Sequence, residues 1–135
     1  MIRKKQRGQA LVEMALVFPV FILLVMGILD LGRAVWQANT MAEAARQGAR
    51  YAITAPSDCT GITNAATSAA VGVKLNASPV TISETGDDDG SLVTVRVTAT
   101  FSPVTPLIAT FTGSSLTISR ASTMAIEYAG SSTCP

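Results

Sequence analysis

The stretch Ala10–Leu29 reads ALVEMALVFPVFILLVMGIL and decides how this chain folds. Glu13 is its single charged residue among 20 positions. A helix of about 20 apolar residues crosses the roughly 30 Å hydrocarbon core of a bilayer. A secretory signal peptide would have a shorter apolar region with a small-residue cleavage site after it, and this stretch has neither. The sequence therefore predicts one transmembrane helix.

Basic side chains precede the apolar run, and no comparable cluster follows it. The basic residues are Arg3, Lys4, Lys5 and Arg7. Because positive charge gathers on the cytoplasmic side of a span, we expect the N-terminus inside and everything after Asp30 outside. Without these four positive side chains the formal net charge falls from +1 to −3. The exported part then has no basic field that would attract nucleic acid.

The helical pattern continues past the apolar run to Ala55, and Pro56 ends it because the residue before a proline avoids the α conformation. Apolar and small residues recur along this continuation at spacings of four and three, which is typical of a stripe that another backbone can approach closely. The stripe consists of Leu31, Val35, Ala38, Ala42, Ala45, Ala49 and Ala52. We predict three parts of the chain: a basic leader (1–8), a transmembrane and extended amphipathic helix (9–55) and an exported domain (56–135).

Several residues mark positions on this helix. Pro19 cannot donate to the carbonyl of Ala15, so a kink or an opened turn is expected there. Asp30 and Arg33 are three residues apart and either pair or remain two solvated charges at the end of the span. Trp36 lies about two turns beyond the run, where indole side chains commonly meet the membrane surface.

The exported domain contains both cysteines of the chain, Cys59 and Cys134. An oxidising compartment favours a bond between them, although two unrelated thiols are the alternative. A bond would close nearly the whole domain, and the chain-entropy model values such a loop at roughly 4–5 kcal/mol. A domain of this size has too few residues for a large core, so a disulfide would stabilise it.

The rest of the domain predicts an α+β fold, with a short helix and then a small antiparallel sheet. We expect a weak alanine-rich helix over Ile62–Leu75 and a short strand over Val80–Ser83. Leu92–Phe101 is the clearest strand, since valine and alanine alternate with threonine and arginine. Leu116–Tyr128 is β-rich, and Arg120 interrupts its alternation, which indicates a bulge or an edge position.

The inventory of reactive residues argues against an enzyme. The chain has no histidine, which removes the usual general base and the commonest metal ligand. Two distant cysteines make no zinc site, and the glycines form no phosphate-binding loop, so no cofactor is expected. Asp87, Asp88 and Asp89 are a weak candidate for calcium binding; the alternative is a solvated turn, because their spacing does not match an EF-hand.

Two motifs resemble the TadE-like proteins, which are minor pilins or pseudopilins of the bacterial tight-adherence (Flp-type) pilus. They are RGQALVEMALVFP at residues 7–19 and GILDLGR at residues 27–33. The resemblance is strong over roughly residues 7–52 and implies a pilin-like architecture. The major Flp pilins carry tyrosine directly after the glutamate, whereas this chain has Met14, and they lack so large an outer domain. The resemblance therefore implies a minor subunit.

The resemblance also implies a processing step and a role for the lone acidic residue. A prepilin peptidase would cut after Gly8 on the cytoplasmic face and leave Gln9 as the new N-terminus. Glu13 would then meet the freed amine of a neighbouring subunit, because a carboxylate in low dielectric needs a partner. Otherwise Glu13 reaches back to the headgroups at the start of the span.

The sequence as a whole predicts a minor pilin anchored in the bacterial inner membrane, with the exported domain in the periplasm or in the extracellular pilus. Its expected partners are other pilins, the prepilin peptidase and the pilus assembly platform. The span, Pro19 and the alanine stripe Ala38, Ala42, Ala45 and Ala49 are expected to pack against other subunits. Two alternatives remain open: an uncleaved single-pass component of the assembly platform, and an anchored module whose Asp87–Asp89 turn holds calcium.

Overall fold

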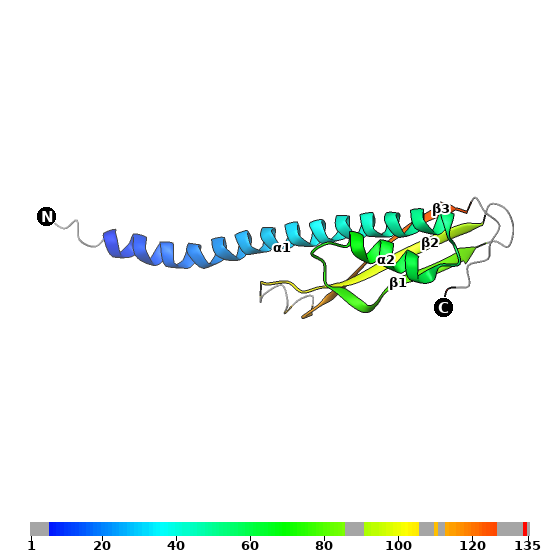
Figure 1. Ribbon diagram of the computed structural model, residues 1–135. Helices are drawn as coiled ribbons and strands as arrows, with labels where there is room; N and C mark the ends of the chain where they lie inside the picture. Colours follow the sequence, from blue (N-terminus) through cyan, green and yellow to red (C-terminus); the bar gives the residue numbers. More distant parts are fainter. Residues whose placement is uncertain (1–5, 86–90, 106–109, 111–112, 127–133, 135) are drawn as a thin grey trace.

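A computed structural model describes residues 6–85, 91–105, 110, 113–126 and 134. It confirms an α+β fold, in which the elements of the described residues are two helices followed by three strands (Figure 1). In chain order these are α1 (Gln6–Thr54), α2 (Cys59–Ala69), β1 (Leu75–Thr85), β2 (Leu92–Phe101) and β3 (Leu116–Ala125).

Helix α1 is the longest element, and its C-terminal part packs against α2 and the sheet. Its 49 residues span about 74 Å at ~1.5 Å per residue. The helix is continuous through Pro19. Its N-terminal part, drawn in blue, curves gently (Figure 1). The proline therefore does not interrupt α1. At the other end the N–H of Ala55 bonds to the carbonyl of Tyr51 at 3.0 Å, and Pro56 follows as expected.

Helix α2 differs from the predicted range of Ile62–Leu75 at both ends. It begins earlier because Asp58 caps it: a carboxylate oxygen accepts the N–H of Gly61 at 2.9 Å. It ends earlier because the chain turns at Gly72, whose φ of +74° is a left-handed conformation suited to glycine. Residues after this turn enter β1.

The sheet has the antiparallel order β1-β2-β3, so β2 is central and the other two strands are edges. The bounds predicted for β2 are confirmed. The pairing of β2 with β3 has no register shift, so there is no bulge at Arg120. Of the two expected positions for Arg120, the structure shows the edge strand. Strand β1 is longer than the predicted Val80–Ser83, and its pairing shifts between Leu75 and Val80, where Pro79 interrupts the ladder.

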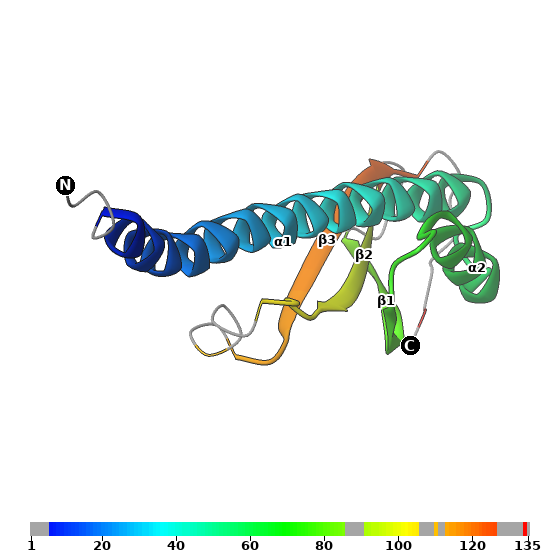
Figure 2. The same cartoon turned by 90° about the vertical axis from the view of Figure 1, so that its left-hand side faces the viewer.

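The helices pack on one face of the sheet (Figure 2). In β2 the alternate residues Val93, Val95, Val97 and Ala99 are fully buried against them. Gly48 of α1 allows the close approach, because a Cβ at this position would lie 2.9 Å from Val95 and 3.1 Å from Ala66. The Cys59–Cys134 disulfide is formed, with 5.6 Å between the Cα atoms, and ties the start of α2 to the C-terminal end. We call the part that these contacts unite, residues 38–134, the cap.

The alanine stripe of α1 packs inside this cap. Ala45, Ala49 and Ala52 have no exposed surface, and Ala38 is also buried; Met41 and Ala44 complete this face of α1. The periodicity correctly predicted a packing face, but its partner is this chain's own sheet and α2. The assignment of Ala38, Ala45 and Ala49 to contacts with another subunit is therefore corrected, because their side chains are already covered; Ala42 is half-buried.

Candidate functional site

The N-terminal part of α1 projects beyond the cap, and none of the other described elements covers residues 10–29 (Figure 1). Over residues 10–29 every residue is exposed except Gly27, which is half-buried. Within the described residues, α1 is the one helix long and apolar enough to cross a membrane, and none of its most apolar window is buried. A surface of this kind is stable in hydrocarbon or against other apolar helices, and costly in water. We call residues 10–29 the free end of α1.

Glu13 lies on this free end, about one turn from its start. Its side chain is exposed, and among the described residues it has no hydrogen bond or ion pair. A carboxylate in hydrocarbon is expensive unless it is paired or reaches water. Because no described residue of this chain neutralises Glu13, a membrane around it would favour a partner from lipid, water or another protein molecule.

Gly8 and Gln9 lie within the first turns of the same helix. A Cβ built on Gly8 would have no atom within 4 Å, and its backbone is helical. An alanine would therefore fit and would favour the helix by roughly 0.5–1 kcal/mol. Nothing in the described fold requires glycine at this position. The structure thus groups Gly8, Gln9, Glu13 and Pro19 on the uncovered part of α1, away from the alanine stripe.

Asp30 marks the point where the free end meets the cap. It is only 4% exposed. Its carboxylate accepts the backbone N–H of Thr105 at 2.8 Å and that of Val104 at 3.1 Å to each oxygen. Arg33 also donates to it at 3.2 Å, so the expected pair exists. The larger role of Asp30 is to join α1 to the segment that follows β2.

These contacts lower the pKa of Asp30 from 3.8 to about 2. The Thr105 hydroxyl beside the carboxylate contributes most, followed by the backbone N–H groups of Thr105 and Val104, while burial opposes them. No hydrogen bond of good geometry joins the buried Thr105 Oγ1 to any described residue. Asp30 is therefore ionised at neutral pH and stabilises the closed joint.

A second polar cluster fixes the far end of α1. The Tyr51 hydroxyl donates to Asp58 at 2.8 Å, and the other carboxylate oxygen caps α2 through Gly61. The N–H of Gly61 and the Tyr51 hydroxyl lower the pKa of Asp58, and the hydrogen bond to that carboxylate raises the pKa of Tyr51. The hydrogen bond between Tyr51 and Asp58 joins the end of α1 to the start of α2.

Sequence reasoning missed the partners of Asp30. The sequence suggests Arg33 as a partner of Asp30, but the principal contacts of Asp30 are 74 and 75 residues away in sequence. An acidic residue just outside an apolar run is a sequence signal that it needs a partner, but the sequence does not show which residues supply the donors. Asp87, Asp88 and Asp89 lie outside the described residues. Within the described part there is no group of three or more acidic or cysteine side chains that would hold a metal ion.

Comparison with known proteins supports the resemblance that the N-terminal motif carries. The sequence model of the family described as TadE-like protein matches residues 8–50, less than half of the chain. These residues comprise the free end of α1 and most of the part that packs in the cap. Neither the curated proteins nor the solved structures give a match. Over residues 8–50, then, this chain is similar to the TadE-like family.

Proposed function

We propose that this protein is a minor pilin, or pseudopilin, that takes part in assembly of a Tad (Flp-type) pilus. The family match links the chain to that pilus system. The observation that carries the proposal is the free end of α1, which is apolar, uncovered and extended well beyond the cap. Such an end serves first as a membrane anchor and then as a surface for packing against other pilin helices.

The proposed orientation has the N-terminus in the cytoplasm and the cap in the periplasm. The basic residues before the free end support it, because they favour the cytoplasmic side. The Cys59–Cys134 disulfide supports it as well, since such bonds persist in the periplasm. The protein would thus be a single-pass component of the bacterial inner membrane before it enters a pilus.

Processing after Gly8 is part of the proposal. Glycine in a helix is costly unless something requires it, and neither backbone conformation nor packing requires it at Gly8. Recognition by another protein would account for a glycine at this position. A prepilin peptidase that recognises the residue before the cleavage site is such a protein. Cleavage would remove the basic leader and leave Gln9 with a free amine.

Glu13 would then become an assembly contact. Two subunits side by side in the membrane place the new amine of one near the carboxylate of the other, and each neutralises a charge that lipid does not solvate. The remaining contact would come from the free end and from Leu31 and Val35, which are 65% and 53% exposed. These are the two members of the predicted stripe that the cap leaves most open.

Pilus assembly in cells that carry Glu13→Gln tests this proposal. Glutamine keeps the shape but not the charge, so we expect the number of surface pili to fall on the order of tenfold or more. Glu43→Gln is the matched control: Glu43 is also exposed on α1, but it pairs with Arg46 and Gln47 on the cap. Normal piliation in the Glu13 variant would refute the assembly contact.

A further inference from the structure

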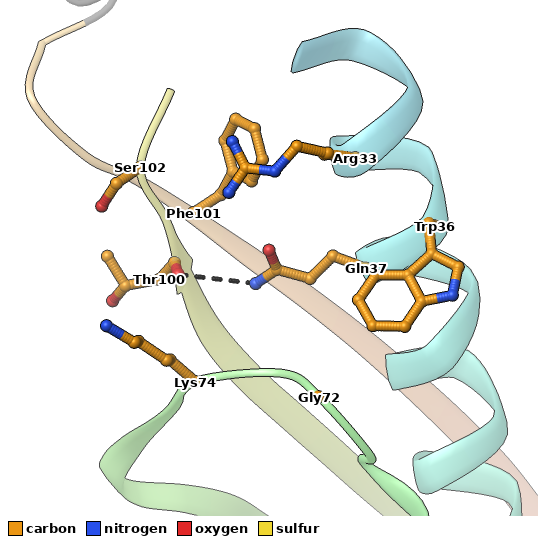
Figure 3. A pocket seen from close by; sticks show the side chains of 8 residues that line it. All are labelled: Arg33, Trp36, Gln37, Gly72, Lys74, Thr100, Phe101 and Ser102. Atoms are coloured by element: carbon orange, nitrogen blue, oxygen red, sulfur yellow. Dashed lines mark hydrogen bonds between the residues drawn. The ribbon is translucent and has the colours of Figure 1, made fainter. Parts of the chain in front are cut away.

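A cavity of about 330 Å³ lies between α1, the end of β2 and the turn that precedes β1 (Figure 3). Arg33, Trp36 and Gln37 line it from α1, and Lys74, Thr100 and Phe101 line it from the other side. The amide of Gln37 donates to the carbonyl of Thr100 at 3.4 Å across the cavity. The indole of Trp36 packs against Gly72, because one of its ring carbons lies 2.9 Å from where a Cβ on Gly72 would be.

The charges of this cavity are both positive. Arg33 and Lys74 are the charged residues among its described lining, which includes no acidic residue; Asp30, outside this lining, forms an ion pair with Arg33. Arg33 uses one N–H for Asp30 and stacks over Phe101 at 5.7 Å, which leaves further guanidinium donors free. Lys74 has no ion pair or hydrogen bond to any residue that the structure describes. The cavity therefore has unused donors for an anion.

The height of the cavity agrees with the level of lipid headgroups. If the hydrocarbon ends at Leu29, Arg33 lies about 6 Å beyond it and Gln37 about 12 Å beyond it along the helix. The headgroup layer of one leaflet is roughly 5–8 Å thick. Arg33 thus lies within this layer. Trp36 lies about 10 Å beyond Leu29 along the helix, just past this layer, and its half-exposed ring is of the kind that meets the membrane surface.

We propose that this cavity binds a phosphate group at the periplasmic membrane surface, with Arg33 and Lys74 as its two cationic ligands. Guanidinium and ammonium groups are the usual partners of phosphate. The phosphate of an anionic lipid headgroup and a free phosphate share this chemistry. A bound lipid would hold the cap at a defined height over the bilayer. The inference rests on the membrane anchoring proposed above.

The fluorescence of Trp36 tests the site directly, because it is the single tryptophan of the chain and lines the cavity. The full-length protein is reconstituted in phosphatidylcholine nanodiscs that contain rising fractions of phosphatidylglycerol. We expect a saturable change in Trp36 emission. In Lys74→Gln the half-maximal fraction should rise about fivefold, since a cation near an anionic membrane contributes about 1 kcal/mol.

Two variants keep the result interpretable. Lys74→Arg should respond like the wild type, because it restores a cation. Arg50→Ala removes an exposed charge about 25 Å further along α1 and should also respond like the wild type. No emission change in the wild type, or the same curve for Lys74→Gln, would overturn the proposal.

A second titration distinguishes the two sources of phosphate. Inorganic phosphate added to pure phosphatidylcholine nanodiscs should leave emission unchanged if the ligand is a lipid headgroup. A response to inorganic phosphate that also depends on Lys74 would assign the site to free phosphate. Failure of the protein to enter nanodiscs would contradict the anchoring itself, whereas a protein that enters without an emission response contradicts the phosphate site alone.

Discussion

The carboxylate of Asp30 accepts the backbone N–H of Thr105 at 2.8 Å, across 75 residues of sequence. This bond joins α1, where it leaves the apolar run, to the segment that follows β2. Together with Val104 and Arg33 it forms the joint between the free end and the cap. The cap is therefore held against the helix at the level where the membrane would end.

Replacement of Asp30 by asparagine should loosen this joint without unfolding the cap. Asparagine has one acceptor oxygen and no charge, so it cannot serve both N–H groups as well as the carboxylate does. We expect amide hydrogen exchange at Thr105 to accelerate on the order of tenfold, while β2 keeps its protection. Glu43→Gln, which removes an exposed carboxylate elsewhere on α1, should leave exchange at Thr105 unchanged.

The same joint should depend on acid. The pKa of Asp30 is about 2 in the folded chain against 3.8 for the free group, so protonation is harder when the joint is closed. Its stabilising effect is complete above pH 3.8 and disappears as the pH falls towards 2. The difference in melting temperature between wild type and Asp30→Asn should shrink over this window. Asp58 also has a lowered pKa, but it is present in both proteins and cancels in the difference.

Two glycines of α1 should respond in opposite directions to the same substitution. Gly48→Ala forces a methyl group against Val95 and Ala66 and should destabilise the protein by about 1–3 kcal/mol. Gly32→Ala meets no atom within 4 Å and should be neutral or stabilise α1 by up to about 1 kcal/mol. Chemical denaturation of both variants in the same detergent measures the difference. Equal effects would contradict the close approach of α1 to β2.

The disulfide should contribute strongly to the stability of the cap. It joins residues separated by 75 positions, for which the chain-entropy model gives about 4–5 kcal/mol. The double variant Cys59→Ser with Cys134→Ser should therefore melt well below the wild type. A reductant should lower the melting temperature of the wild type to a similar value and leave the double variant unaffected. A wild type that is insensitive to reductant would contradict this contribution.

The sequence predicted the elements whose pattern is strong and local. The apolar run and the alternation of β2 have one clear period each, so α1 and β2 were placed well. The bounds of α2 were wrong because its alanine-rich sequence has no sharp periodicity and the cap at Asp58 decides its start. Edge strand β1 was underestimated because Pro79 obscures its pattern.

The candidate site was predictable only in part. Glu13 stands out in a sequence because one acidic residue in an apolar run is rare and costly. The alanine stripe was visible too, but spacing alone does not say whether a packing face meets this chain or another one. The contacts of Asp30 were not predictable, because they join segments that only the folded cap brings together.

The leader offers the clearest test of processing. Gly8→Leu should block cleavage and abolish piliation, because a bulky side chain occupies the position that a prepilin peptidase would read. Gly32→Ala is the control, since Gly32 is equally uncrowded in α1 but lies beyond the free end. Loss of cleavage in both variants would show that the effect comes from the helix and not from the cut site.

Intact-mass spectrometry of the protein purified from its native membrane tests the central claim most directly. The account predicts a chain that begins at Gln9 and retains the Cys59–Cys134 disulfide. A chain that still carries Met1–Gly8 would contradict the pilin assignment and would favour an uncleaved single-pass component of the assembly platform.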